Sequence, residues 1–220
     1  MSIPKAGVSP EQVLAAIYGK SSLATGMSEK RRDEVIAAAL FISFRNQEFG
    51  SRFMIPADFR DGNLKEDAAG IDLIVFDPQG RKKQLQIKGI HIQSSIERRK
   101  THSTTGVARI TSFKSQRFIK RDSEELTKIM KHELEKIVQD YSGISLIIYV
   151  SADLATQTSL EIAIRQSQSV VAHLKAKEVW FLRNIPVRMI HGKASNPNCH
   201  AYQLIKVAPD KHAYGFVFSL

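Results

Sequence analysis

Cysteine is nearly absent from this chain: Cys199 is the single cysteine among 220 residues, so no internal disulfide can form. This scarcity is typical of proteins that fold in a reducing compartment, and we expect a cytoplasmic location. No apolar run approaches the roughly 20 residues that cross a bilayer. The first 20 residues also lack an uninterrupted apolar stretch before a small-residue cleavage site. The sequence therefore predicts neither a membrane-spanning helix nor a signal peptide.

Several motifs that carry chemistry are missing as well. The seven histidines form no HExxH pattern and a CxxC pair is impossible, which argues against a zinc site. Cys199 and His200 are neighbours, but adjacency in sequence does not make a nucleophile and its base. There is no glycine-rich loop of the Walker or GxGxxG type. Zinc chemistry, cysteine catalysis and a nucleotide-driven motor are therefore not expected.

Acidic residues are scarce relative to basic ones. The chain has 22 Asp and Glu against 32 Lys and Arg, a formal net charge of +10. Much of the surplus falls in residues 94–121, where Glu97 is the single acid. Such a segment can neutralise phosphates of a nucleic acid, although a solvated loop can have the same composition. The candidate nucleic-acid-binding residues are Arg98, Arg99, Lys100, Arg109, Lys114, Arg117, Lys120 and Arg121.

The sequence contains alternating helix and strand patterns that suffice for one domain over residues 1–220. Helices are predicted over residues 9–20, 28–47, 123–141 (capped by Asp122 or Ser123) and 159–175. Strands are predicted over 51–59, 71–76, 83–90, 144–151, 178–182, 201–207 and 214–220. The predicted fold class is α/β, a mixed central sheet flanked by helices. Its core covers about 28–183, and a C-terminal β-hairpin extension covers about 184–220.

The most informative stretch is GIDLIVFDPQGRKKQLQIKG, residues 70–89, which predicts two antiparallel strands joined by a turn. Asp72 opens the first strand. Gln86 and Lys88 are two residues apart on the second strand, so their side chains point to the same face of the sheet. Antiparallel pairing brings Asp72 level with the region near Lys88. We therefore expect these three polar groups to converge.

These residues, and the order of the elements around them, resemble the PD-(D/E)xK nuclease superfamily. The resemblance covers roughly residues 28–150 and rests on Gly-Ile-Asp at 70–72 and Gln-Ile-Lys at 86–88. It implies a restriction endonuclease-like fold and an Mg²⁺-dependent (or Mn²⁺-dependent) endonuclease that hydrolyses phosphodiester bonds. DNA is the expected substrate, in restriction, repair or junction processing. A homodimer or a larger nuclease complex stays open as the assembly.

The resemblance also implies a role for each residue of the hairpin. Asp72 is the principal metal ligand, Gln86 offers its amide oxygen, and the backbone carbonyl of Ile87 completes the protein's share. Lys88 orients the attacking water and stabilises the transition state as a fixed positive charge. Glu34, on the predicted second helix, holds metal directly or through water. The implied catalytic residues are Glu34, Asp72, Gln86 and Lys88, and the implied metal ligands are Asp72, Gln86, Ile87 and Glu34.

Each assignment has a structural alternative. Asp72 could be a strand-end acid that faces water, and Lys88 an edge-strand lysine that discourages aggregation. Glu34 could simply favour the amino-terminal dipole of its helix. Asp67 is a spare candidate for an oxygen ligand. Asp77 falls in the DPQG turn, where Asp is expected for structural reasons.

The sequence departs from the superfamily pattern at two positions. Gln86 replaces the commoner glutamate, which removes one negative charge and predicts weaker metal binding. Ile71 stands where the superfamily's name has proline. The alternative function is a catalytically inactive, nuclease-like protein that binds nucleic acid or acts as a scaffold. A third interpretation is an RNA-cleaving toxin or a subunit of a larger restriction complex.

Overall fold

The computed structural model describes residues 7–19, 25–59, 70–91, 116–137, 139–151, 157–185, 199–208 and 211–219. The strands in this part of the chain are β1 (Gly7–Val8), β2 (Ile55–Pro56), β3 (Leu73–Phe76), β4 (Lys82–His91), β5 (Tyr141–Ser151), β6 (Ala176–Ile185), β7 (Cys199–Ala208) and β8 (His212–Ser219). The helices are α1 (Pro10–Tyr18), α2 (Glu29–Phe49), α5 (Gln116–Glu135), α6 (Gln157–Gln166) and α7 (Gln168–Val171).

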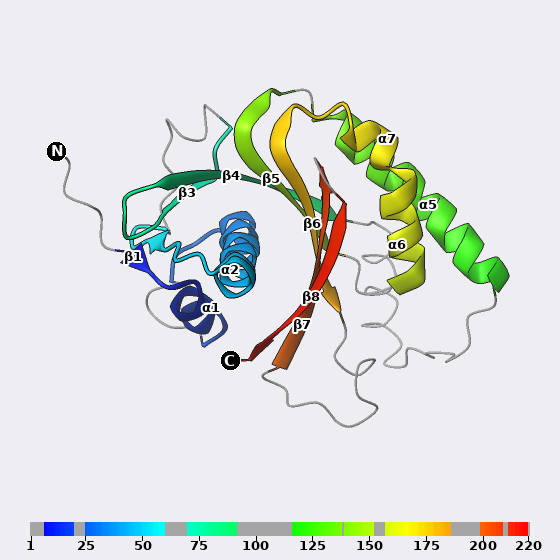
Figure 1. Cartoon of the computed structure of the whole chain (residues 1–220). Helices are drawn as coiled ribbons and strands as arrows, with labels where there is room; N and C mark the ends of the chain where they lie inside the picture. Colours follow the sequence, from blue (N-terminus) through cyan, green and yellow to red (C-terminus); the bar gives the residue numbers. More distant parts are fainter. Residues whose placement is uncertain are drawn as a thin grey trace.

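Six of the strands form one mixed sheet in the order β3-β4-β5-β6-β7-β8. The central strands β4, β5 and β6 are parallel, and the pairs at both ends of the sheet are antiparallel. The sheet bends around α2, which lies with α1 on one face, while α5, α6 and α7 cover the other face (Figure 1). The predicted α/β class, with a mixed sheet flanked by helices, is confirmed.

Each face of the sheet has its own hydrophobic core, because the strands alternate their side chains between the two helical layers. On β4, Leu85 and Ile87 pack into the core that contains α2, whereas Ile90 belongs to the core under α5 and α6. On β5, Ile147 faces the first core, and its neighbour Ile148 faces the second. A parallel strand that is buried on both sides explains the continuous apolar run in its sequence.

Helix α2 begins where its sequence predicts and ends two residues beyond the predicted position 47, at Phe49. The Oγ of Ser28 accepts a hydrogen bond from the backbone N–H of Arg31 at 3.1 Å, which caps the helix. Gly50 ends it with a left-handed backbone (φ 60°). Residues 37–44 in its middle are buried, so this part of α2 is nearly surrounded by apolar neighbours. Its amino-terminal turns stay polar, and these turns reach the candidate site.

The prediction for the third helix was wrong at both ends. α5 begins at Gln116, so Asp122 and Ser123 lie inside the helix and do not cap it. Arg and Lys are good helix formers, and the basic residues before position 122 extend the helix by two turns. The helix ends at Glu135, and Tyr141 already belongs to β5. The apolar residues after 135 keep the helical spacing, which is why the sequence pattern predicts a longer helix.

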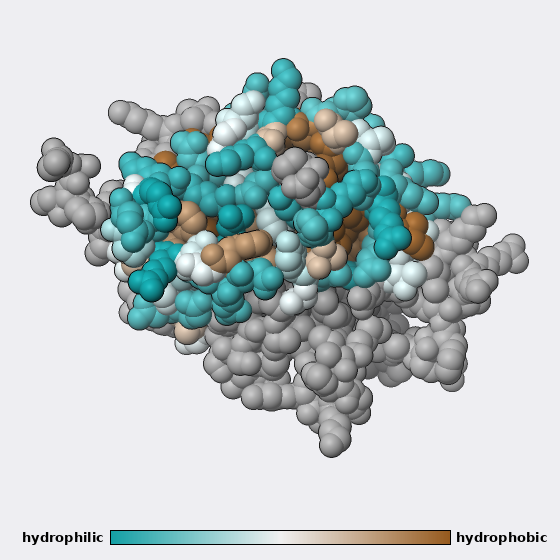
Figure 2. Space-filling view, viewed as in Figure 1, coloured by the Kyte–Doolittle hydropathy of each residue, from teal (hydrophilic) through white to brown (hydrophobic). Residues whose placement is uncertain are grey.

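The C-terminal hairpin is part of the main sheet. β7 pairs with β6 from Val179 to Ile185, and β8 completes the sheet on that side. The helix predicted over 159–175 is interrupted at Ser167, which separates α6 from α7. Predicted strand 51–59 forms only β2 and one further bridge, from Met54 to Phe76. The described surface on the face in Figure 2 is mostly hydrophilic, with small apolar patches between polar side chains.

Candidate functional site

The β3–β4 hairpin fixes the position of Asp72. Leu73 pairs with Leu85, and the backbone N–H of Asp72 donates to the carbonyl oxygen of Leu85 at 3.0 Å. Asp72 therefore lies opposite Gln86, two residues short of Lys88. The predicted antiparallel hairpin is confirmed. Its register places Asp72 directly opposite Gln86 and not opposite Lys88.

The turn of the hairpin depends on Asp77. Its Oδ1 accepts hydrogen bonds from the backbone N–H groups of Gln79 (3.0 Å) and Arg81 (2.8 Å), and its Oδ2 pairs with Arg81 Nε at 2.6 Å. Burial acts to raise the pKa of Asp77, but the hydrogen bonds from Arg81 outweigh it and the pKa is lowered. Gly80 has a φ of 78°, which a glycine adopts without strain. The structural role predicted for Asp77 is confirmed.

The carboxylate of Asp72 is held by the opposite strand. Its Oδ2 accepts a hydrogen bond from Gln86 Nε2 at 2.5 Å and another from the backbone N–H of Ile87 at 2.6 Å. Gln86 Nε2 also lies 3.4 Å from the carbonyl oxygen of Ile87. Gln86 Oε1 is buried and has no hydrogen-bond partner among the residues that the structure describes. A buried acceptor without a donor costs about 1–3 kcal/mol, so this oxygen stands out.

Burial raises the pKa of Asp72 to about 6. The hydrogen bond from the Ile87 N–H opposes this rise, the neighbouring carboxylate of Glu34 adds to it, and the charges of Lys88 and Lys30 lower it again. The protonated, neutral form of the Asp72 carboxyl is therefore favoured more than in water, and a positive charge placed nearby would favour the ionised form.

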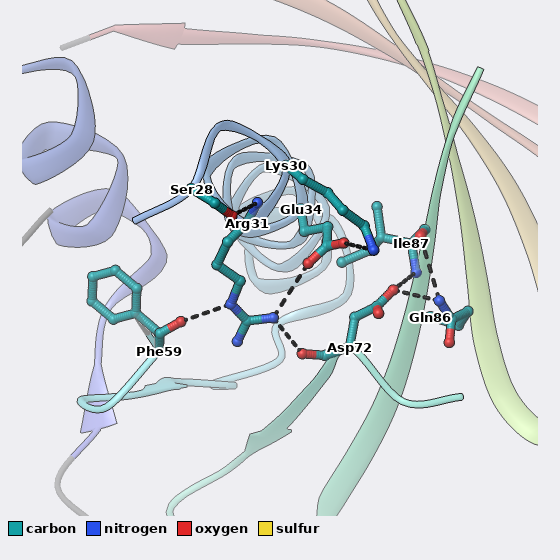
Figure 3. Close-up of polar contacts among 8 residues, drawn as sticks. All are labelled: Ser28, Lys30, Arg31, Glu34, Phe59, Asp72, Gln86 and Ile87. Carbon is teal, nitrogen blue, oxygen red and sulfur yellow. Dashed lines mark hydrogen bonds and ion pairs between the residues drawn. The ribbon is translucent and has the colours of Figure 1, made fainter. Parts of the chain in front are cut away.

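The amino-terminal turns of α2 supply the other side of the site (Figure 3). Glu34 forms ion pairs with Lys30 at 3.5 Å and with Arg31 at 3.4 Å. Arg31 also donates through Nη1 to the carbonyl oxygen of Asp72 at 2.8 Å and through Nε to that of Phe59 at 3.1 Å. One guanidinium thus joins the helix, the entry to β3 and the segment after β2.

A cavity of about 590 Å³ lies between α2 and β4. Four acids and two lysines are among its lining residues, so its wall is more acidic than the chain as a whole. The lining residues are Glu29, Lys30, Asp33, Glu34, Asp72, Gln86, Ile87, Lys88, Gly89 and Tyr149. Lys88 Nζ lies 6.0 Å from the ring centre of Tyr141. The structure therefore brings Glu34, Asp72, Gln86, Ile87 and Lys88 to one cavity.

A hard cation could be held in this cavity only by a combination of carboxylate, amide and backbone carbonyl oxygens. Among the described residues, no three His, Cys, Asp or Glu side chains are grouped closely enough to hold one metal ion. However, rotating the Gln86 amide by 180° would turn its unpartnered Oε1 toward Asp72 Oδ2. Two oxygen acceptors that face each other repel, and a cation between them would remove this repulsion. Asp72 Oδ1 accepts no hydrogen bond from the described residues. The pattern of oxygens fits magnesium or manganese.

Sequence reasoning missed Arg31, Lys30 and Asp33. Lys30 and Asp33 lie within one turn of Glu34, so the helical spacing could have found them. Arg31 fits the same helical spacing as a partner of Glu34, but its hydrogen bonds to the carbonyls of Phe59 and Asp72 join segments far apart in sequence and had no such signal.

Most of the residues predicted to contact nucleic acid lie outside the described part of the chain. Of the candidates, Arg98, Arg99, Lys100, Arg109 and Lys114 lie outside the described residues, as does Asp67. Arg117, Lys120 and Arg121 belong to the first turns of α5, where only the backbone path is described. The prediction for this basic segment therefore stays a prediction.

Comparisons with protein-family models, curated proteins and solved structures find no match for this chain. None of the helices in the described ranges is long and apolar enough to span a bilayer.

Proposed function

We propose that this chain is an Mg²⁺- or Mn²⁺-dependent endonuclease that hydrolyses phosphodiester bonds in DNA. The observation that carries the proposal is the convergence of Asp72, the Gln86 amide and the Ile87 backbone on one cavity with Glu34 and Lys88. The order α2, β2, β3, β4, α5, β5 also agrees with a restriction endonuclease-like fold. A single cysteine fits a cytoplasmic enzyme.

The residues of the cavity would have different roles in this reaction. The Asp72 carboxylate, the amide oxygen of Gln86 and the carbonyl of Ile87 would hold the cation, and Glu34 would act directly or through water. When bound, the cation lowers the pKa of a water and offsets charge on the phosphoryl oxygens. Lys88 provides a positive charge that orients the attacking water and stabilises charge in the transition state. Arg31 keeps the Asp72 backbone fixed against α2.

The test is cleavage of plasmid, linear and branched DNA with magnesium or manganese. Wild type is compared with Asp72→Ala and Lys88→Ala at matched DNA binding. We expect cleavage that needs the metal and is lost in both variants. DNA binding by all three proteins with no cleavage of any substrate would overturn the proposal.

A second candidate is a nuclease-like protein that binds nucleic acid without cleaving it. It is favoured by one observation: Gln86 presents an amide where a carboxylate would add charge, and its Nε2 already donates to Asp72. In that case Asp72 is a structural acceptor for β4. The same cleavage assay separates the two candidates.

A further inference from the structure

A second cavity, of about 430 Å³, lies at the amino ends of the three parallel strands. Lys82 and Lys83 open β4, Gly143 is the third residue of β5, and Lys177 is the second residue of β6. Arg45 reaches the same cavity from the last part of α2. Phe53 and Gln84 complete the lining. We call this group the basic cradle.

The inner layer of the basic cradle is a buried charge network around Glu178. The Glu178 carboxylate pairs with Lys83 Nζ, lies 3.3 Å from Arg45 Nη1 and accepts a hydrogen bond from Ser145 Oγ at 2.6 Å. Burial acts to raise the pKa of Glu178, but the charge and hydrogen bond of Lys83 dominate and lower the pKa to about 2. The Glu178 carboxylate thus holds both Lys83 and Arg45 in place, and this inner group has a net charge of one positive unit.

The outer layer adds two more cations. Lys82 and Lys177 are exposed, and neither forms an ion pair with any residue in the described part of the chain. No carboxylate other than Glu178 is close enough to pair with this cluster among those residues. The basic cradle therefore presents a concave positive surface, which favours phosphate groups.

An exposed aromatic side chain lies next to the basic cradle. Phe49 is 48% exposed, and its ring is 5.1 Å from the guanidinium carbon of Arg45 and 6.1 Å from the ring of Tyr214. An aromatic face beside a cationic groove is the arrangement that binds bases and backbone of single-stranded nucleic acid. This neighbour favours a nucleic acid over a small free phosphate.

The basic cradle and the acidic cavity are both lined by residues of α2 and β4, from opposite ends of these two elements. Five residues of strand separate Lys83 from Lys88, about 17 Å at the usual rise. Eleven residues of helix separate Glu34 from Arg45, again about 17 Å.

We propose that the basic cradle is a second nucleic-acid contact, in which Lys82 and Lys177 bind backbone phosphates and Phe49 stacks on a base. It goes beyond hydrolysis at Asp72, because it predicts binding without any divalent cation. The choice of nucleic acid as the ligand rests in part on the proposed function. Metal-free binding therefore distinguishes a failure of the cradle from a failure of the catalytic site.

The experiment measures binding of fluorescent single-stranded and duplex oligonucleotides in EDTA at several salt concentrations. The test variant is Lys82→Ala with Lys177→Ala. The matched control is Lys128→Ala with Arg165→Ala, which removes two exposed charges from α5 and α6 on the other face. Both double variants should keep the thermal unfolding of wild type. Phe49→Ala is measured alongside them.

We expect the cradle variant to bind about 10-fold more weakly at low salt and to lose about 1.8 from the duplex slope of log K against log salt. The control should keep the wild-type slope. Phe49→Ala should weaken single-strand binding about 10-fold. Equal slopes for wild type and cradle variant would overturn the proposal. So would a cradle variant that loses binding to inorganic tripolyphosphate while its oligonucleotide affinity is unchanged, because the ligand would then be a free phosphate compound.

Discussion

At the scale of single residues, Asp72 combines two conflicting demands. It is held by the Gln86 amide and the Ile87 N–H, which favour an ionised carboxylate, but it is buried beside Glu34, which favours the neutral form. The second effect dominates. An ionisable side chain whose burial lowers the stability of the folded protein, as at Asp72, is typical of functional sites.

Asp72→Asn should stabilise the metal-free protein near neutral pH. Because the pKa of Asp72 is about 6 in the folded chain and 3.8 without the fold, the folded state binds the extra proton between these values. Stability therefore falls as pH rises from about 4 to 6, and the cost above pH 6 is about 2–3 kcal/mol. Denaturant unfolding in EDTA should show this gain at pH 7 and none near pH 4. The same gain at both pH values would contradict the assignment.

Gln86→Glu tests whether this side chain is a metal ligand. A second carboxylate beside Asp72 should lower the stability of the metal-free protein at pH 7, because two like charges share one site. It should also tighten binding of Mg²⁺ or Mn²⁺ by about 10-fold or more. Thermal unfolding against cation concentration measures both effects. Unchanged cation affinity would show that Gln86 is not a ligand.

At the scale of elements, the first turns of α2 connect the helical layer to the hairpin. Ser28 caps the helix, and Arg31, three residues later, reaches two backbone carbonyls on other segments. The helix start therefore sets where Asp72 enters the sheet. Gly70, just before this entry, has a φ of 72°, a left-handed backbone that a residue with a Cβ adopts only with strain.

Arg31→Lys should loosen this connection. A single ammonium cannot reproduce the fork that spans the carbonyls of Asp72 and Phe59, so we expect a loss of about 1–3 kcal/mol in the free energy of unfolding. If the proposed nuclease is active, kcat should fall more than DNA binding does. Arg32→Lys is the control, since Arg32 makes one long hydrogen bond, 3.4 Å to Ile17, and should change stability by less than about 0.5 kcal/mol. Equal effects of the two variants would contradict a positioning role for Arg31.

At the scale of the whole molecule, the C-terminal hairpin of β7 and β8 contributes residues to both hydrophobic cores. Leu204 on β7 belongs to the core around α2, and Val207 belongs to the core under α5 and α6. Trp180, on the neighbouring strand β6, packs edge-on against Phe41 and Phe44 of α2. The hairpin thus continues the main sheet and supports the layer that carries Glu34.

Leu204→Ala should therefore destabilise the entire fold by about 2–5 kcal/mol, as a buried leucine in a central core does. One cooperative transition, followed by circular dichroism in urea, should move as a unit. His173→Ala, in the exposed turn after α7, is the control and should leave the midpoint unchanged. If the Leu204 variant unfolds like wild type, or in two separate steps, the hairpin is an independent extension.

The sequence by itself determined the local structure of this protein. The caps Ser9 and Ser28, the apolar spacing of α2 and the turn chemistry around Asp77 act between residues a few positions apart, and all four were predictable. The pairing of Asp72 with the Gln86 strand followed from the same turn. Local rules failed where helical spacing ran past the end of α5.

The tertiary structure decided what no local pattern encodes. The reach of Arg31 to the Phe59 and Asp72 carbonyls depends on how α2 lies against the sheet. The unpartnered oxygen of Gln86 depends on which groups surround it after packing. The basic cradle joins α2 to three strands whose first residues are neighbours only because the strands are parallel. Contacts between segments so far apart in sequence leave no periodic signal, so only the folded chain determines them.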